Sequence, residues 1–333
     1  MAQFAAPQES TYTIHPGHMA VRKPTNLNDE DVVEGKALIG RPLNYPTRVS
    51  ALIFRLRLAE LCQSLLEKNP SLAMNPDSLP YANVMEIDGK LRGFLQDLPD
   101  FFCLDNVTLR SLPPQDPRRA HHIVVQRYTL NLMLHRHLCK LHLPYLARGT
   151  VDATFSYSRN ACLMSARMII HAEKMLKMEG LPFSTTRLRS IMVIRSVFLA
   201  SIVLVLNACL SNDVNGNDAD TEHLIESWRI LDEAKGQSLT AAKLLELSVQ
   251  VLRRHAPSHV ALSNLPQMAS EPMPMTPESA PHDEQRKMMP QMELRPEIEP
   301  TYIEQQWQAL EGRMDLNTID WDKLFYGLDA PFI

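Results

Sequence analysis

Three side chains between residues 118 and 142 have the types and the spacing of a metal site. His135, Cys139 and His142 occupy positions i, i+4 and i+7, so a helix would place two imidazoles and one thiol on a single stripe. Zinc and copper prefer such ligands, but a fourth ligand would have to come from elsewhere in the chain. Because a cysteine in an apolar helix usually fills the core, the pattern favours a structural role over a metal site.

The short motifs of the common enzyme classes do not occur in this sequence. It contains no G-x-G-x-x-G, no phosphate-binding G-x4-G-K-[ST], no G-x-S-x-G and no H-E-x-x-H. Residues 171–173 (HAE) match the H-x-E half of the zinc deaminases, but the P-C-x-x-C half is missing. The sequence therefore predicts a protein that is not an enzyme, with no catalytic residue and no cofactor.

Bulky apolar residues with helical spacing lie between residues 320 and 329. The positions i, i+3, i+4 and i+7 of one helical face are occupied by Trp321, Leu324, Phe325 and Leu328. The carboxylates of Asp320, Asp322 and Asp329 flank this stripe, so the segment stays soluble alone and yet offers apolar anchors. Two interpretations remain open: the stripe packs back on the rest of the chain, or it binds a partner protein as an activation segment.

Composition favours a soluble, nearly all-α protein. The 333 residues are 45% hydrophobic but include only 11 glycines and 6% aromatic residues. This composition lacks the glycine-rich turns and β-branched runs that sheets need. The net charge of −4 argues against nucleic-acid binding by this chain alone, and five scattered cysteines indicate free thiols in a reducing compartment. The apolar stretch 191–210 contains Arg195 and Asn207, so we expect a buried core helix and no membrane association.

The pattern along the chain divides it into four parts. Residues 1–44 form an extended lead-in, 45–255 a helical domain, 256–300 a disordered linker rich in proline and methionine, and 301–333 an acidic-aromatic C-terminal segment that is helical in part. Apolar periodicity predicts helices over 47–68, 81–96, 118–142, 154–178, 185–209 and 222–254, the last with a break near Gly236. The first of these helices is expected to bury the row Val49, Leu52, Ile53, Leu56, Ala59 and Leu66.

Several phrases occur in the order found in one known family. They are residues 23–31 (KPTNLNDED), 55–60 (RLRLAE), 87–91 (IDGKL) with 98–102 (LPDFF), 126–128 (QRY) with 140–146 (KLHLPYL), 157–167 (YSRNACLMSAR) and 321–325 (WDKLF). Together they resemble the middle homology region of fungal zinc-cluster transcription factors. None of the five cysteines has the C-x2-C spacing of that family's six-cysteine zinc cluster.

The resemblance implies a regulatory role in transcription and a location in the nucleus. It implies a helical domain that binds the transcription machinery or a co-regulator protein and that forms a homodimer, without zinc and without direct DNA binding by this chain. An alternative that the family also implies is small-molecule sensing, for which we expect an apolar pocket between the helices of 121–142 and 185–210.

Overall fold

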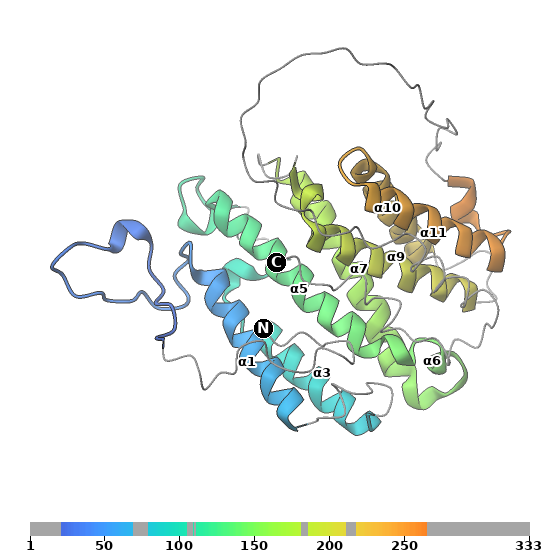
Figure 1. Cartoon of the computed structure of the whole chain (residues 1–333), viewed down its shortest axis with the longest axis horizontal. Helices are drawn as coiled ribbons and strands as arrows, with labels where there is room; N and C mark the ends of the chain where they lie inside the picture. Colours follow the sequence, from blue (N-terminus) through green and yellow to red (C-terminus); the bar gives the residue numbers. More distant parts are fainter. Residues whose placement is uncertain are drawn as a thin grey trace, which may run out of the picture. The chain divides into compact units, whose positions relative to one another are not determined.

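The computed structural model describes residues 21–68, 79–104, 109, 111–180, 186–210 and 218–264. All regular structure in these ranges is helical, which confirms the all-α prediction (Figure 1). The α-helices are α1 (Ser50–Lys68), α3 (Tyr81–Gln96), α5 (His121–His142), α6 (Arg148–Val151), α7 (Ser156–Met178), α9 (Ile191–Leu210), α10 (Asp218–Lys235) and α11 (Leu239–His255). Short 3-10 turns join them, at η2 (Asp29–Asp31), η4 (Asp100–Phe102), η5 (Pro117–Arg119), η6 (Leu143–Tyr145), η7 (Ala153–Phe155), η8 (Arg187–Arg189) and η9 (Val260–Asn264).

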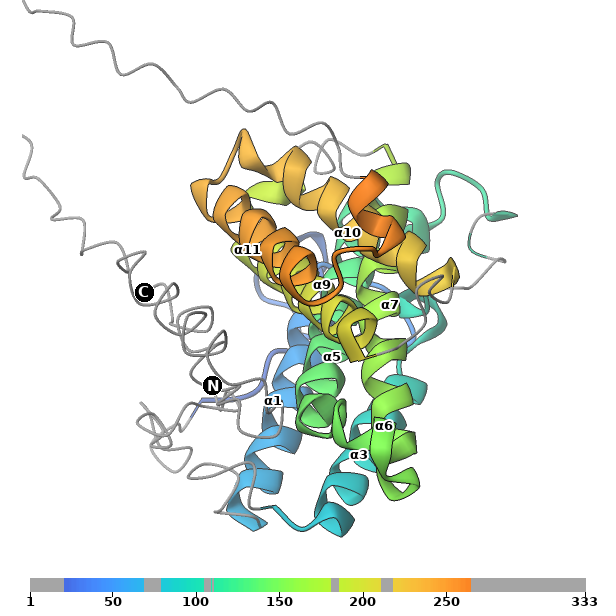
Figure 2. The same cartoon turned by 90° about the vertical axis from the view of Figure 1, so that its right-hand side faces the viewer.

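The helices form layers around α5 and α7, which share the most extensive contact. Helices α1 and α3 pack on one side of α5, and α9 packs against α7, with α10 and α11 beyond it (Figure 2). Helix α7 ends at Gly180, whose φ of 64° is the left-handed conformation that glycine adopts without strain. The segment predicted as one helix over 222–254 is two helices, and the Ser238 hydroxyl accepts a hydrogen bond from Ala241 N at the start of the second.

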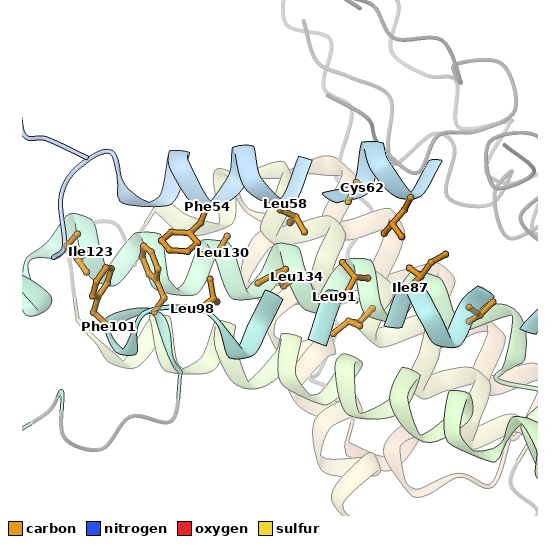
Figure 3. Close-up of a cluster of buried hydrophobic side chains, with 14 of the residues drawn as sticks. Phe54, Leu58, Cys62, Ile87, Leu91, Leu98, Phe101, Ile123, Leu130 and Leu134 are labelled. Carbon is orange, nitrogen blue, oxygen red and sulfur yellow. The ribbon is translucent and has the colours of Figure 1, made fainter. Parts of the chain in front are cut away.

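Of the row predicted for helix α1, Ile53 is buried, but a neighbouring row supplies most of the core contacts. Leu52 is 44% exposed, and the row that faces the core is Phe54, Leu58, Cys62 and Leu65 (Figure 3). The helix carries two apolar rows, and aromatic packing decides between them: the Phe54 ring lies edge-on to Phe102, with the centroids 5.6 Å apart. Periodicity alone could not rank the two rows, because both have helical spacing.

Helix α9 is the most apolar element of the described chain. Its segment Met192–Leu210 has a mean hydropathy of 2.2 and is, among the described helices, the one that is long and apolar enough to cross a membrane. In the structure 78% of that segment is buried, by α7, α10 and α11. Burial by neighbouring helices on all sides is typical of a core helix, and it matches the buried helix expected from the sequence.

The helical body reaches beyond the predicted range at both ends. Asn26 is 4% exposed and its side-chain amide donates to the backbone oxygens of Pro42 (2.9 Å) and Tyr45 (3.0 Å), so the described part of the lead-in is a closed loop. After α11, the turn η9 buries Ala261 against α10 and α11, which places the end of the body at Asn264 instead of residue 255. The remainder of the linker and the whole segment 301–333 lie outside the described residues.

Candidate functional site

Three of the recognised phrases meet in one buried polar network. Asp88 lies in the middle of α3, His142 is the last residue of α5, and Ser158 lies in the first turn of α7. His142 Nε2 is 2.9 Å from Asp88 Oδ1, and His142 Nδ1 is 2.9 Å from Ser158 Oγ. Tyr81, at the start of α3, is the last member of this hydrogen-bond network, because its hydroxyl is 3.0 Å from Ser158 Oγ. Residues far apart in the sequence are thereby joined at one helix junction.

Each donor of this network has an acceptor. A carboxylate only accepts hydrogen bonds, so His142 Nε2–H donates to Asp88. His142 Nδ1, the Ser158 hydroxyl and the Tyr81 hydroxyl continue the series of hydrogen bonds. Asp88, His142 and Ser158 are therefore all hydrogen-bonded although they are buried.

Asp88 is the charged centre of the network. The carboxylate also accepts hydrogen bonds from Arg92 and Tyr157. Arg92 Nε lies 2.9 Å from each of the two carboxylate oxygens, and the Tyr157 hydroxyl donates to Oδ2 at 2.5 Å. Burial alone would raise the pKa of Asp88, but the hydrogen bonds from His142, Tyr157 and Arg92 outweigh it and lower the pKa to about 2. Asp88 therefore carries its negative charge at neutral pH.

The order Asp, His, Ser is that of a hydrolase triad, but its geometry here is that of a packing contact. Ser158 and His142 are 0% exposed and Asp88 is 2% exposed. A nucleophile must reach a substrate carbonyl and needs oxyanion donors beside it, whereas the hydrogen-bonding partners of Ser158 are the side chains of Tyr81 and His142. The role of the network is structural, because it holds α3, α5 and α7 in register.

Two of the three side chains that suggested a metal site on α5, Cys139 and His142, make other contacts. The Cys139 thiol faces Cys162 of α7, with the sulfurs 3.9 Å apart, and Cys162 Sγ donates to Cys139 O at 3.5 Å. His142 points to Asp88 and Ser158 instead. Within the described ranges, no group of three or more His, Cys, Asp or Glu side chains is arranged to hold a metal ion.

The zinc cluster of the resembled family does not fit the thiols of this chain. All five cysteines are free; Cys139 of α5 and Cys162 of α7 face each other, and the other three lie in α1, after η4 and in α9. Burial raises the pKa of Cys62 and of Cys209 to about 11, which keeps both thiols protonated. Metal-binding thiolates need the opposite environment, so these two thiols do not suit a zinc site.

Two further phrases also supply polar links inside the body. Arg127 Nε donates to Phe101 O and Asn131 Nδ2 donates to Phe102 O, both at 2.7 Å, so the turn after Leu98-Pro99 is fixed to α5. The Asn26 carbonyl accepts from the Thr47 hydroxyl at 2.6 Å, which attaches the lead-in to the start of α1. Residues of four of these phrases (23–31, 87–102, 126–146 and 157–167) thus make polar links between parts of the fold.

A second buried ionic cluster was missed by the sequence reasoning. Arg187 Nε lies 2.5 Å from Glu173 Oε1, its Nη2 lies 3.0 Å from Glu233 Oε1, and Lys177 Nζ lies 2.6 Å from Glu233 Oε2. Burial raises the pKa of Glu173 even though the Arg187 charge opposes it. Spacing gave no signal here, because the partners come from α7, η8 and α10. The glutamate of the H-x-E phrase is therefore an ion-pair partner.

The hypothesis of small-molecule sensing gains no support from the packing. The core-facing side chains of α5 and α9, such as Leu132 and Val197, are 0% exposed. They belong to the continuous packed core between these helices, and the pocket between them stays a prediction. The predicted partner-binding residues Trp321, Leu324, Phe325 and Leu328 lie outside the described residues.

Curated relatives of the chain are named as fungal transcription factors. The probable transcription factor lepB of Aspergillus flavus is 28% identical over 346 residues, which covers 100% of this chain and 60% of lepB. The agnestins biosynthesis cluster transcription factor AgnL11 of Paecilomyces divaricatus is 29% identical over 76% of the chain and 35% of its own length. The Zn(2)-C6 fungal-type transcription factor pigI of Monascus ruber is 24% identical over 48% of the chain and 19% of its own length.

No family model matches the chain, and no solved structure matches it. The chain spans 60% or less of the length of these relatives. It is therefore similar, from end to end, to part of a longer fungal transcription factor.

Proposed function

We propose that this chain is a regulatory, protein-binding part of a fungal transcription factor and acts in the nucleus. One observation carries the proposal: the similarity to the probable transcription factor lepB covers the whole chain, including the segment 301–333. The ordered phrases that resemble the zinc-cluster family support the same assignment, and several of them make links in the helical body.

DNA contact by this chain is not part of the proposal. Its formal net charge is −4 and its thiols are buried or scattered, so it offers neither a cationic surface of the required size nor a zinc-cluster donor set. We assign DNA binding to a six-cysteine cluster outside this sequence or on a partner subunit, and homodimerisation of the body would bring two such clusters together. The chain itself then needs no cofactor.

The proposed role is also non-catalytic. The arrangement of Asp88, His142 and Ser158 is the closest approach to a reactive constellation among the described residues, and its serine is completely buried. The part that recruits partners is the acidic-aromatic segment, in which Trp321, Leu324, Phe325 and Leu328 supply the apolar anchors. The partner would be the transcription machinery or a co-regulator protein.

A tethering experiment tests the proposal. The full chain is fused to an unrelated DNA-binding domain and a reporter is measured, with the variants Trp321→Ala and Phe325→Ala and the matched control Tyr302→Ala. We expect reporter activity that falls at least several-fold in the first two variants and not in the control. A silent reporter with all four fusions expressed in the nucleus would contradict the activation role, and equal activity in all four would contradict the assignment of the anchors.

A further inference from the structure

Two thiols face each other at the contact between α5 and α7. The Sγ atoms of Cys139 and Cys162 are 3.9 Å apart, and both side chains are 0% exposed. Each sulfur also lies near the backbone of the other residue: Cys162 Sγ is 3.5 Å from Cys139 O, and Cys139 Sγ is 3.9 Å from Cys162 O. The two backbones therefore approach closely here, in the most extensive contact between any two of the described helices (Figure 1).

Small side chains on α7 allow this approach. Ser158, Ala161, Cys162 and Ser165 occupy positions i, i+3, i+4 and i+7 of one helical face, and all four are buried. Two of them, Ser158 and Cys162, are in contact with side chains of α5. Because the distance between two helix axes depends on the size of the side chains between them, such a face brings the two helices close together.

The two sulfurs are near the separation at which they can form a covalent bond. In a disulfide the sulfurs lie about 2.05 Å apart. From 3.9 Å they have to approach by about 2 Å, which is within the range of rotation of the two side chains about χ1. The pair therefore needs no rearrangement of the helices to react.

We propose that Cys139 and Cys162 form a site of reversible oxidation by hydrogen peroxide, at which a disulfide joins α5 to α7. One sulfur attacks an oxygen of the peroxide, the O–O bond breaks, and the products are a sulfenic acid and one water. The second thiol then attacks the sulfur of the sulfenic acid, the S–S bond forms, and the hydroxyl leaves with the thiol proton as a second water. Two thiols lose two electrons in total, and one peroxide gains them.

Burial makes the site selective for a small oxidant and slow to react. Burial and the neighbouring Cys139 thiol raise the pKa of Cys162, so little of this thiol is in the reactive thiolate form. A bulky thiol reagent does not reach a side chain that is 0% exposed, whereas hydrogen peroxide is neutral and small. Reduction by other thiols also needs access to the sulfurs, so the disulfide outlasts the exposure to peroxide.

The disulfide joins the same two helices as the polar network. Cys139 lies three residues before His142 on α5, and Cys162 lies four residues after Ser158 on α7. The sulfurs are therefore about one helical turn from the hydrogen bond between His142 and Ser158. Oxidation makes this contact covalent, and the cross-link between positions 139 and 162 also restricts the unfolded chain. The inference goes beyond the proposed function, because it requires neither a partner protein nor DNA.

Peptide mapping of the full chain tests the proposal. The native protein is treated with millimolar hydrogen peroxide, the remaining thiols are alkylated in urea, and the protein is digested with trypsin. We expect the peptides 137–140 (HLCK) and 160–167 (NACLMSAR) to be linked, lighter than the sum of their masses by two hydrogen atoms, with or without an added oxygen on the exposed Met164. Dithiothreitol should release both peptides.

The variants are Cys139→Ala and Cys162→Ala, and the matched control is Cys62→Ala, which removes another buried thiol, in α1. We expect the control to form the same linked pair as the parent. In the first two variants the remaining thiol of the pair should be found in no disulfide. In the parent, oxidation should raise the urea midpoint by roughly 0.5 to 1 M and leave the circular dichroism at 222 nm unchanged.

Three other results would overturn the proposal. The first is a linked pair that forms only when peroxide is added in urea, because the native contact would then not bring about the reaction. The second is a disulfide of Cys139 or Cys162 with any other cysteine or with a second copy of the chain. The third is an oxidised parent whose urea midpoint is the same as or lower than that of the reduced protein, since the bond would then not hold the native contact.

Discussion

Replacement of Asp88 by asparagine keeps the shape of the side chain and removes its negative charge from the junction of α3, α5 and α7. His142 Nε2–H can still donate to the amide oxygen, but the amide NH2 must then face Tyr157 or Arg92, which are also donors. Arg92 is 37% exposed and can turn to water, whereas His142 is completely buried and cannot. The new contact between two donors therefore falls on Tyr157 or Arg92, while the buried His142 keeps its bond to the amide oxygen.

The magnitude follows from the pKa of the carboxyl group. Folding lowers the pKa of Asp88 from 3.8 to about 2, and about 1.4 kcal/mol per unit gives about 2 kcal/mol of stability at neutral pH. Since the pKa of Asp88 in the folded state is the lower one, this stability is complete above about pH 5 and is lost as the pH falls through 4 towards 2. The donor facing another donor in the Asp88→Asn variant adds to the cost, so we expect 2 to 3 kcal/mol, roughly, in total.

Urea unfolding followed by circular dichroism at 222 nm measures this difference. The matched control is Glu86→Gln, two residues away on α3, where the carboxylate is 56% exposed and pairs with Lys90. A surface pair of this kind contributes little to stability. Between pH 5 and pH 3 the gap between the parent and Asp88→Asn should narrow by about 1 kcal/mol, while the gap for Glu86→Gln stays small.

Two results would refute the reasoning. One is an Asp88→Asn variant as stable at pH 7 as the Glu86→Gln control, which would mean that the network contributes nothing beyond a surface pair. The other is a gap of 2 kcal/mol, roughly, that is the same at pH 3 as at pH 7, because the loss would then come from packing and not from the carboxylate charge.

Three further predictions rest on other parts of the body. Gly180→Ala should lower the free energy of unfolding by about 1 kcal/mol because of the φ of 64°, whereas Gly93→Ala inside α3, with no atom near a new Cβ, should raise it by about 0.5 to 1 kcal/mol in the same urea assay. Arg187→Met should cost about 3 to 5 kcal/mol by leaving a buried carboxylate without its cation, and the variant should gain stability relative to the parent as the pH falls from 7 to 5 and that carboxylate takes up a proton. At pH 8 a thiol reagent should react quickly with about one of the five cysteines, the half-buried Cys103, and with all five in urea, because Cys62, Cys139 and Cys162 are buried and burial raises the pKa of the half-buried Cys209 to about 11; fast reaction of three or more in the native protein would contradict the core assignment.

The sequence predicted the helices well and the side-chain contacts poorly. Helix α3 has the predicted bounds, and α9 is the buried helix expected from its apolar residues, because composition and periodicity are local properties. The choice between the two rows of α1 depends on the Phe54–Phe102 contact, which only tertiary packing determines. The polar network could not be predicted from spacing either, since Asp88 and His142 are 54 residues apart.

The resemblance pointed to the right residues for a reason that the structure explains. Residues 88, 142 and 158 lie in three separate phrases of the resembled family, and all three are buried, with His142 hydrogen-bonded to both Asp88 and Ser158. Polar side chains in such positions are restricted in type, because any replacement leaves a buried partner unsatisfied. A phrase of this kind therefore marks where helices are joined, and it says little about where a ligand or a partner binds.

Register is the property that this network adds to the apolar core. Apolar side chains of similar size on α3, α5 and α7 would still find contacts if one helix slid by a turn of about 5.4 Å, with only a modest loss of packing. The hydrogen bonds that join His142 to Asp88 and to Ser158, 2.9 Å each, would both break in the same slip, and each would leave a buried polar group without a partner. The network thus penalises the alternative packings that the hydrophobic effect alone would tolerate, and it fixes the position of α5 against α3 and α7.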